Sequence, residues 1–234
     1  MKTLSIIIPV FNEEKTIKQI LNKVKQIKLP NLNKEIIVIS DCSTDNTDRI
    51  LSTEKNIKFI RHKKNIGKGA AVKTGLKEAT GDLVIIQDAD LEYDPIYYAK
   101  LLEPVLREKA SVVYGTRLKN YPLKFWGKNK TVLPSHLIAN KFLTLLTKIL
   151  YGGNVTDMET GYKLFSKKIL DEIDIKSNKF DFEAEVTAKV LKRKVSIVEV
   201  PISVTPRTYK EGKKIGWEDG ISAIWTLIKY RFIN

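Results

Sequence analysis

Short apolar runs alternate with segments of helical periodicity through the first half of the chain. Apolar runs rich in β-branched residues predict buried strands at 4–9, 35–40, 57–61, 83–86 and 111–114. Between the strands, apolar residues recur at helical spacing, as in the segment from Ile17 to Ile27. Asn12 and Asp94 are predicted helix caps. Strands that alternate with helices favour an α/β fold with a mostly parallel central sheet flanked by helices.

The second half of the chain follows a less regular pattern. Helices are predicted at 135–150, 182–192 and 217–232, and one or two short strands within 195–204. A basic and aromatic stretch at 119–133 and a basic, glycine-containing stretch at 207–216 are predicted loops. No linker separates a second domain. We therefore expect residues 1–234 to form one domain with two halves, 1–117 and 118–234.

Composition narrows the classes of protein and partner. Hydrophobic residues make up 43% of the 234 residues, which is enough for a packed core. A single cysteine excludes an internal disulfide and a cysteine-based metal cluster, and it suits a reducing compartment. No signal-peptide pattern and no membrane-spanning apolar run is visible, so we expect a cytoplasmic protein. The formal net charge of +14 indicates a polyanionic partner, namely nucleic acid, anionic lipid or a phosphorylated substrate.

Acidic residues cluster directly after the predicted strand at 83–86. Asp88 and Asp90 are separated by one residue, and Glu92 follows. Ligands of α/β sheets bind outside the carboxyl ends of the strands. Carboxylates at such a place can hold a divalent cation against a phosphate. An ordinary polar loop would explain any one of these acids, but the three together favour a site.

Two other strand ends and one helix start carry further candidates. The loop from Pro9 to Glu13 follows the first strand, and Asp41 follows the second, where its carboxylate can accept hydrogen bonds from a base or ribose. Lys68 lies between two glycines at a predicted helix N-terminus, where backbone N–H groups and the helix dipole favour an anion. The absence of Gly-x-Gly-x-x-Gly and Walker A patterns disfavours dinucleotide-binding and P-loop folds.

Charged residues in the later part of the chain suit either of two substrate groups, an alcohol or a phosphate. An alcohol needs a general base. Asp157 and Glu159 are candidates, although helix capping or pairing with Lys163 would explain them equally well. A lipid phosphate is already ionised and needs cationic clamping instead. Such cations favour a substrate that carries a phosphate, and the chain offers them at Arg117, Lys128, Lys130, Arg207, Lys210, Lys213 and Lys214.

The sequence resembles family 2 glycosyltransferases of the GT-A fold, most nearly the polyprenyl-phosphate sugar transferases of the dolichyl-phosphate mannosyltransferase group. The segments that carry the resemblance cover nearly the whole chain, at 5–13, 39–45, 65–69, 88–90, 115–117, 156–163, 206–207 and 212–214. The resemblance implies an inverting, metal-dependent hexosyltransferase. Its donor would be a GDP- or UDP-sugar, and its acceptor a polyprenyl phosphate of the dolichyl or undecaprenyl type.

The resemblance also implies roles for individual residues. Nucleotide-sugar binding would involve Pro9, Val10, Phe11, Glu13, Asp41, Lys68, Asp88, Ala89 and Asp90. Mg²⁺ or Mn²⁺ would be held by Asp88, Asp90 and Glu92. The catalytic residues would be Asp90, Arg117 and Arg207, and the acceptor phosphate would meet Arg117, Lys130, Ser135 and Arg207.

Two apolar segments raise the question of a membrane. The segments 135–150 and 221–228 are apolar, and basic residues follow the second, as is typical of helices at a membrane surface. An ordinary core-facing helix is the competing interpretation. We expect peripheral contact at the cytoplasmic face of a membrane, compatible with a membrane-spanning partner. Transfer to a glycan hydroxyl in cell-surface polysaccharide synthesis is the alternative function. A basic nucleic-acid-binding protein ranks below both because the sequence has no base-reading motif.

Overall fold

The computed structural model of the chain describes residues 1–118, 134–208, 212–214 and 216–233. The predicted loop at 119–133, with Lys128 and Lys130, lies outside the described residues, as does Lys210. The strands are β1 (Lys2–Val10), β2 (Leu32–Ser40), β3 (Lys58–Arg61), β4 (Leu83–Ile86), β5 (Val112–Thr116), β6 (Lys163–Ser166) and β7 (Ile197–Pro201). The helices are α1 (Ile17–Gln26), α2 (Thr47–Thr53), α3 (Lys68–Glu78), α4 (Tyr98–Leu106), α5 (Pro134–Tyr151), α6 (Lys167–Asp171), α7 (Phe182–Lys192) and α8 (Trp217–Phe232), with a 3₁₀ turn, η1 (Pro95–Tyr97), before α4.

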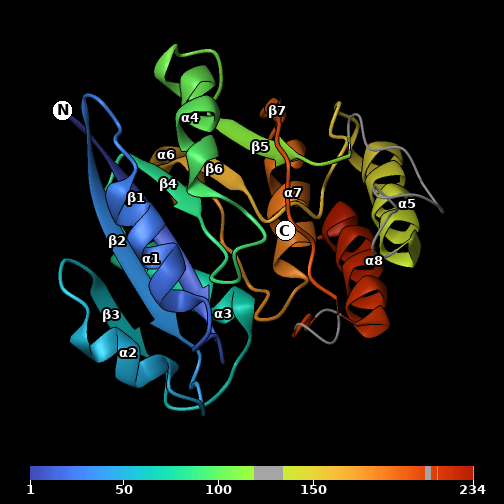
Figure 1. Ribbon diagram of the computed structural model, residues 1–234. Coiled ribbons are helices and arrows are strands. Elements are labelled where there is room, and N and C mark those ends of the chain that lie inside the picture. The colour runs from blue at the N-terminus through green and yellow to red at the C-terminus, as the bar shows by residue number, and fades with distance from the viewer. Residues whose placement is uncertain (119–133, 209–211, 215, 234) are drawn as a thin grey trace, which may run out of the picture.

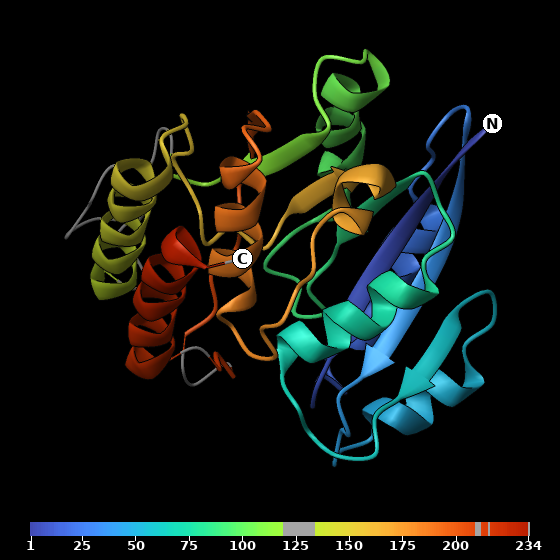
Figure 2. The ribbon, with the colours of Figure 1, turned by 180° about the vertical axis from the view of Figure 1, so that it is seen from behind.

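One seven-stranded sheet organises the molecule, in the order β3-β2-β1-β4-β6-β5-β7. Strands β3, β2, β1 and β4 pair in parallel, and β6 pairs antiparallel with both β4 and β5. Helices α1 and α4 cover one face of the sheet, and α3 and α7 cover the other (Figure 1, Figure 2). The predicted α/β fold with a mostly parallel sheet is therefore confirmed.

Burial on both faces explains the continuous apolar run of β1. Successive side chains of a strand point to opposite faces of the sheet. Ile6 and Ile8 accordingly enter the core beneath α1, whereas Ile7 enters the core beneath α3, and all three are fully buried. A strand with two buried faces has no polar alternation, which is why β1 appears in the sequence as a continuous apolar run.

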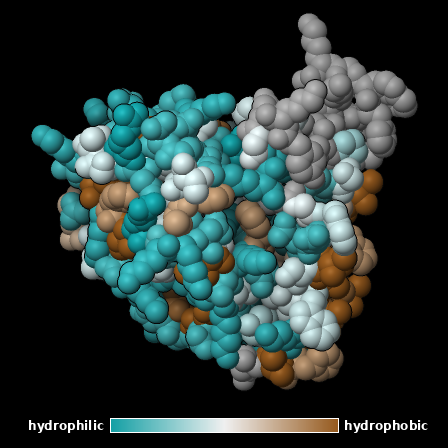
Figure 3. Space-filling model, turned by 90° about the horizontal axis from the view of Figure 1, so that it is seen from below, coloured by the Kyte–Doolittle hydropathy of each residue, from teal (hydrophilic) through white to brown (hydrophobic). Residues whose placement is uncertain are grey.

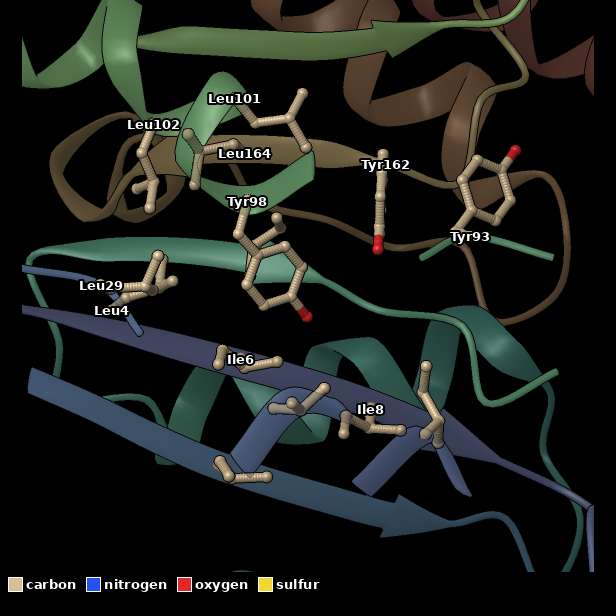
Figure 4. Packing of buried hydrophobic residues seen from close by; sticks show 14 of the residues in the cluster. Leu4, Ile6, Ile8, Leu29, Tyr93, Tyr98, Leu101, Leu102, Tyr162 and Leu164 are labelled. Carbon is tan, nitrogen blue, oxygen red and sulfur yellow. The ribbon is translucent and has the colours of Figure 1, made fainter. Parts of the chain in front are cut away.

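A polar contact is built into the apolar core at the end of β4. The hydroxyls of Tyr98 and Tyr162 donate hydrogen bonds to Oε1 of Gln87, at 2.8 and 2.7 Å. The ring of Tyr162 packs against the rings of both Tyr93 and Tyr98, among leucine and isoleucine side chains, as Figure 4 shows. Because Gln87 directly precedes Asp88, this contact fixes the carboxyl end of β4.

Several local predictions are confirmed, and others are wrong. Asp94 caps the turn before α4, since its Oδ1 accepts a hydrogen bond from Ile96 N at 3.0 Å. Asn12 does not cap α1: that helix begins at Ile17, and Oδ1 of Asn12 accepts a hydrogen bond from Thr44 N at 2.8 Å instead. The sequence pattern does not predict β6 or α6. Strand β6 has only four residues and begins with a lysine, so its sequence shows no clear period. It forms because it pairs with β4 and β5.

We expect two glycine substitutions to change stability in opposite directions. A Cβ on Gly75 of α3 would lie 2.4 Å from Ile7 Cγ2 and 2.8 Å from Ile39 Cδ1. Gly75→Ala should therefore lower the free energy of unfolding by about 1–3 kcal/mol through overpacking. At Gly220 of α8, no described atom lies within 4 Å of the added Cβ. Gly220→Ala should raise the free energy of unfolding by about 0.5–1 kcal/mol through helix propensity. Denaturant titration measures both values, and a stabilised Gly75→Ala protein would contradict the packing described here.

Candidate functional site

A cavity of about 350 Å³ opens at the carboxyl ends of β1, β2 and β4. All nine residues predicted for nucleotide-sugar binding line it, namely Pro9, Val10, Phe11, Glu13, Asp41, Lys68, Asp88, Ala89 and Asp90. The second half of the chain contributes Glu159, Glu183, Arg207, Lys213 and Lys214. The fold thus brings the predicted residues together, while their individual roles stay predictions.

Basic side chains face the acidic residues that follow β4. Lys68 Nζ lies 2.8 Å from Asp88 Oδ1, and Nη2 of Arg207 donates a hydrogen bond to Asp90 Oδ2 at 2.9 Å. Glu92 Oε1 lies 3.5 Å from Lys213 Nζ. Burial, followed by the charges of Asp88 and Glu92, raises the pKa of Asp90 to about 6, and Arg207 opposes that rise. The carboxylates are thus crowded enough to require cations beside them.

The acidic residues fit a divalent cation only together with a ligand. Among the residues that the structure describes, no three His, Cys, Asp or Glu side chains are grouped so that they could hold a metal ion. The predicted three-carboxylate arrangement of Asp88, Asp90 and Glu92 is therefore not formed by these side chains alone. Mg²⁺ is commonly bound by one or two carboxylates together with substrate phosphates. Asp88 and Asp90 suit a metal on that condition, because both line the cavity.

Asp41 supports the loop that presents Lys68. Its carboxylate accepts hydrogen bonds from the backbone N–H groups of Ile66, at 3.0 Å, and Gly67, at 2.6 Å. Nδ1 of His62 lies 2.8 Å from the same carboxylate. Gly67 has a φ of 118°, which side chains disfavour, and an added Cβ would lie 2.4 Å from Asn178 O. Asp41 therefore positions this loop in addition to lining the cavity, a role that its sequence position does not reveal.

Arg117 and Asp157 form a buried fork-to-fork ion pair. Nε and Nη2 of Arg117 donate to the two carboxylate oxygens of Asp157, each at 2.7 Å, and the backbone N of Arg117 donates at 2.9 Å. Asp157 is fully buried, so a guanidinium engages both of its oxygens away from water. Lys163 does not pair with Asp157 and instead donates to the carbonyls of Met158 and Thr160. This arrangement makes Asp157 a poor general base.

Glu159 and Glu183 line the cavity, and each has a buried oxygen without a described partner. Oε1 of Glu159 and Oε2 of Glu183 are buried and have no hydrogen-bond partner in the described part of the chain. Burial and the charge of Glu183 raise the pKa of Glu159 to about 7, and Lys163 and Arg117 oppose the rise. Sequence reasoning missed Glu183, because an acid in the first turn of a helix usually only complements the helix dipole. Its burial in α7, a helix buried along almost its whole length, is visible only in the folded structure.

The predicted acceptor residues are only partly gathered at the cavity. Arg117 and Arg207 line it. Ser135 is exposed in the first turn of α5 and is not among the lining residues, so its role stays a prediction. Lys130 lies outside the described residues. The structure adds Tyr93 and Phe180 to the lining, neither of which the sequence predicts as a site residue.

A family model described as Glycosyl transferase family 2 matches residues 5–174. This span contains the strand ends with Asp41, Asp88 and Asp90. The chain belongs to glycosyltransferase family 2. The family and the enzyme class expected from the sequence motifs are thereby confirmed.

Relatives of this glycosyltransferase include enzymes that act on lipid phosphates. It is 29% identical to the UDP-N-acetylglucosamine–dolichyl-phosphate N-acetylglucosaminyltransferase of Methanococcus voltae, over 97% of this chain and 95% of the relative. It is 29% identical to the dolichol-phosphate mannosyltransferase of Pyrococcus furiosus, over 91% of this chain and 59% of the relative.

A solved structure confirms the GT-A fold of this glycosyltransferase. Glucosyl-3-phosphoglycerate synthase from Mycobacterium tuberculosis, in complex with Mn²⁺, UDP and phosphoglyceric acid, superposes with a TM-score of 0.74. The similarity covers 100% of this chain and 80% of that chain, at 22% sequence identity. At such an identity the likeness bears on the fold alone.

We expect Asp157→Asn to destabilise this glycosyltransferase strongly. The substitution leaves the guanidinium of Arg117 buried without its anion, which should lower the free energy of unfolding by about 3–5 kcal/mol. Asp171→Asn is the matched control, because Asp171 pairs with Lys167 on an exposed helix turn and is 58% exposed. Exposed pairs contribute less than about 1 kcal/mol. Equal effects of the two substitutions, measured by denaturant titration, would show that the Arg117–Asp157 pair has no special structural role.

Proposed function

We propose that this glycosyltransferase transfers a hexose from a GDP- or UDP-sugar to a polyprenyl phosphate, such as dolichyl or undecaprenyl phosphate, with inversion at the anomeric carbon. One observation carries the proposal. The guanidinium of Arg207 lies between Asp90 and Glu13, with nitrogen–oxygen distances of 2.9 and 3.1 Å, and so adds a cation to the acidic end of the cavity. A cavity with acids and cations side by side suits two phosphate-bearing substrates.

The donor half of the proposal rests on the strand ends. Pro9, Phe11 and Asp41 would border the nucleotide, and Lys68 would meet its diphosphate at the start of α3. Asp88 and Asp90 would hold Mg²⁺ or Mn²⁺, which supplies charge neutralisation for the departing nucleoside diphosphate. The synthase from Mycobacterium tuberculosis, which shares the fold, is seen with Mn²⁺ or Mg²⁺ together with UDP.

The acceptor half rests on cations. A lipid phosphate is ionised near neutral pH, so it needs positive charge rather than a base. Arg117, Arg207, Lys213 and Lys214 line the cavity and can meet such a phosphate. The two relatives named for dolichyl or dolichol phosphate support this acceptor. The positive charge of the chain then matches anionic substrates and lipids, and we propose no nucleic-acid partner.

One observation favours a second candidate function, transfer to a glycan hydroxyl. Such an acceptor needs a base, and Glu159 has a buried oxygen without a hydrogen-bond partner among the described residues. Its pKa of about 7 suits proton transfer near neutral pH. Asp157, the other candidate base, is engaged by Arg117. Glu159 is therefore the base that this second function would use.

An apolar surface formed by α5 and α8 supports peripheral membrane contact. The two helices pack against each other. Large apolar side chains are exposed on both, namely Ile138, Phe142, Leu145 and Ile149 of α5, and Trp217, Ile221, Trp225 and Phe232 of α8. Figure 3 shows hydrophobic surface on the side of the molecule where α5 and α8 lie in Figure 1. Exposed Lys229 and Arg231 near the end of α8 add positive charge suited to anionic lipid headgroups.

The same surface defines what kind of membrane contact we propose. Among the described residues, no helix is long and apolar enough to cross a bilayer. Tryptophan and basic side chains beside an apolar helix face are typical of contact in the plane of the interface. We place the protein at the cytoplasmic face of a membrane, where this surface would bring the cavity to a lipid-linked phosphate.

We expect Asp90→Asn to lower sugar transfer by about 100-fold or more, because a carboxylate that would hold the metal beside the leaving diphosphate is lost. The assay follows a radiolabelled sugar from GDP- or UDP-sugars into solvent-extractable polyprenyl phosphate. Asp171→Asn serves as the control, and thermal unfolding shows whether each variant stays folded. Near-normal turnover of Asp90→Asn would refute the assigned role. A wild-type enzyme that labels glycans but no polyprenyl phosphate would favour the second function.

We expect Trp225→Glu to weaken binding to vesicles by roughly tenfold, because a large apolar contact with lipid is replaced by a charge. The vesicles contain anionic lipid and polyprenyl phosphate, and binding is measured by co-sedimentation. Ile96→Glu is the matched control: Ile96 is 67% exposed and Trp225 is 64% exposed, but Ile96 lies in η1, far from α8 in the sequence. Equal loss of vesicle binding in both variants would contradict a membrane contact through α5 and α8.

A further inference from the structure

The carboxylates of Glu159 and Glu183, on the cavity wall, are not among the groups proposed to bind phosphate or metal. Oε1 of Glu159 and Oε2 of Glu183 are buried, and neither has a hydrogen-bond partner among the described residues. Both residues line the cavity. Buried polar atoms of folded proteins are nearly always hydrogen-bonded. These two oxygens therefore require hydrogen-bond donors, which a ligand in the cavity would bring.

Glu183 is joined to Asp88 through Lys68, and the backbone that follows Glu159 approaches Asp88. Lys68 Nζ is 2.8 Å from Asp88 Oδ1 and 2.9 Å from Glu183 Oε1, so one ammonium group joins the two side chains. Glu159 stands two residues before Gly161, where an added Cβ would lie 2.3 Å from Asp88 Oδ2. The two free oxygens thus belong to the part of the cavity beside the proposed diphosphate position. Asp41, at the end of β2, lies toward the proposed nucleotide.

Resting on the proposed function, we infer that Glu159 and Glu183 form the subsite for the hexose of the donor. A hexose is joined to the diphosphate through its anomeric carbon, so it must lie directly beside the diphosphate. Its hydroxyl groups donate hydrogen bonds, and a carboxylate oxygen is an acceptor of such bonds. Hydrogen bonds to an ionised acceptor are shorter and stronger than bonds between neutral groups. A hexose hydroxyl at each carboxylate would satisfy the two buried oxygens.

The same chemistry selects among sugars. A neutral hexose or an amino sugar supplies donors to both carboxylates. A hexuronic acid brings a carboxylate of its own, and like charges at close range disfavour the wrong ligand. The subsite therefore takes a neutral or amino sugar and rejects a uronic acid.

Titration calorimetry with Mn²⁺ tests the inference, with UDP, GDP, UDP-glucose and GDP-mannose as probes. Glu159→Gln keeps the size of the side chain and removes its charge. We expect its Kd for the nucleoside diphosphate to stay within about twofold of wild type, and its Kd for the nucleotide sugar to rise about tenfold or more. Glu172→Gln, an exposed control, should leave both values unchanged. Glu183→Gln should weaken both ligands, because Lys68 also loses its partner.

A uronic acid donor gives a second readout that a merely structural role would not move. The uronic acid donor is UDP-glucuronic or GDP-mannuronic acid, chosen to match the nucleotide that binds. Wild type should bind it about tenfold more weakly than the neutral donor. In Glu159→Gln the difference between these two Kd values should be smaller. A uronic acid bound as tightly as the neutral hexose would overturn the inference. The inference would also be overturned if Glu159→Gln weakened binding of the nucleoside diphosphate and of the nucleotide sugar equally. If wild type binds neither UDP nor GDP with Mn²⁺, the proposed function itself fails.

Discussion

The buried amide of Gln87 is the contact on which the cavity depends. Its Oε1 accepts hydrogen bonds from two tyrosine hydroxyls, and its Nε2 donates to the carbonyls of Asp88, at 2.9 Å, and Tyr93, at 3.1 Å. A fully buried amide with satisfied donors and acceptors rigidifies its surroundings, whereas a partly satisfied one would be costly. The acidic segment after β4 therefore leaves the sheet in one fixed direction.

The second half of the chain also contacts the segment that follows β4. The hydroxyl of Tyr93 accepts a hydrogen bond from Gly161 N at 2.8 Å, and β6 begins two residues later. Gly161 approaches Asp88 so closely that a side chain would not fit without displacing that carboxylate. The insertion of β6 between β4 and β5 thus carries Glu159 to the cavity wall. The antiparallel strand β6 therefore contributes to the site as well as to the core.

Local patterns predict the parts of this molecule that local forces create. The parallel strands, the helices at 182–192 and 217–232 and the acidic segment after β4 all follow from periodicity and position in the sequence. Contacts between distant segments do not. Arg207 meets Glu13 across 194 residues, and the partner of Asp157 is Arg117, where the sequence suggested Lys163. Glu183 becomes a site residue only because the sheet order brings α7 to the cavity. Such residues carry no local signal that separates them from solvated charges.

The pairing of these charges also bears on how the site would accept its substrates. In the folded chain Asp88 faces Lys68, Asp90 faces Arg207, and Glu92 faces Lys213. Unpaired buried charges are expensive, so a cavity with only acids or only cations would cost stability. A divalent cation and the diphosphate of a nucleotide sugar carry opposite charges of similar size. Binding them together exchanges one set of ion pairs for another at nearly constant net charge. The basic segment from Arg207 to Lys214 is thus suited both to balance the acids and, once released from them, to meet the phosphates.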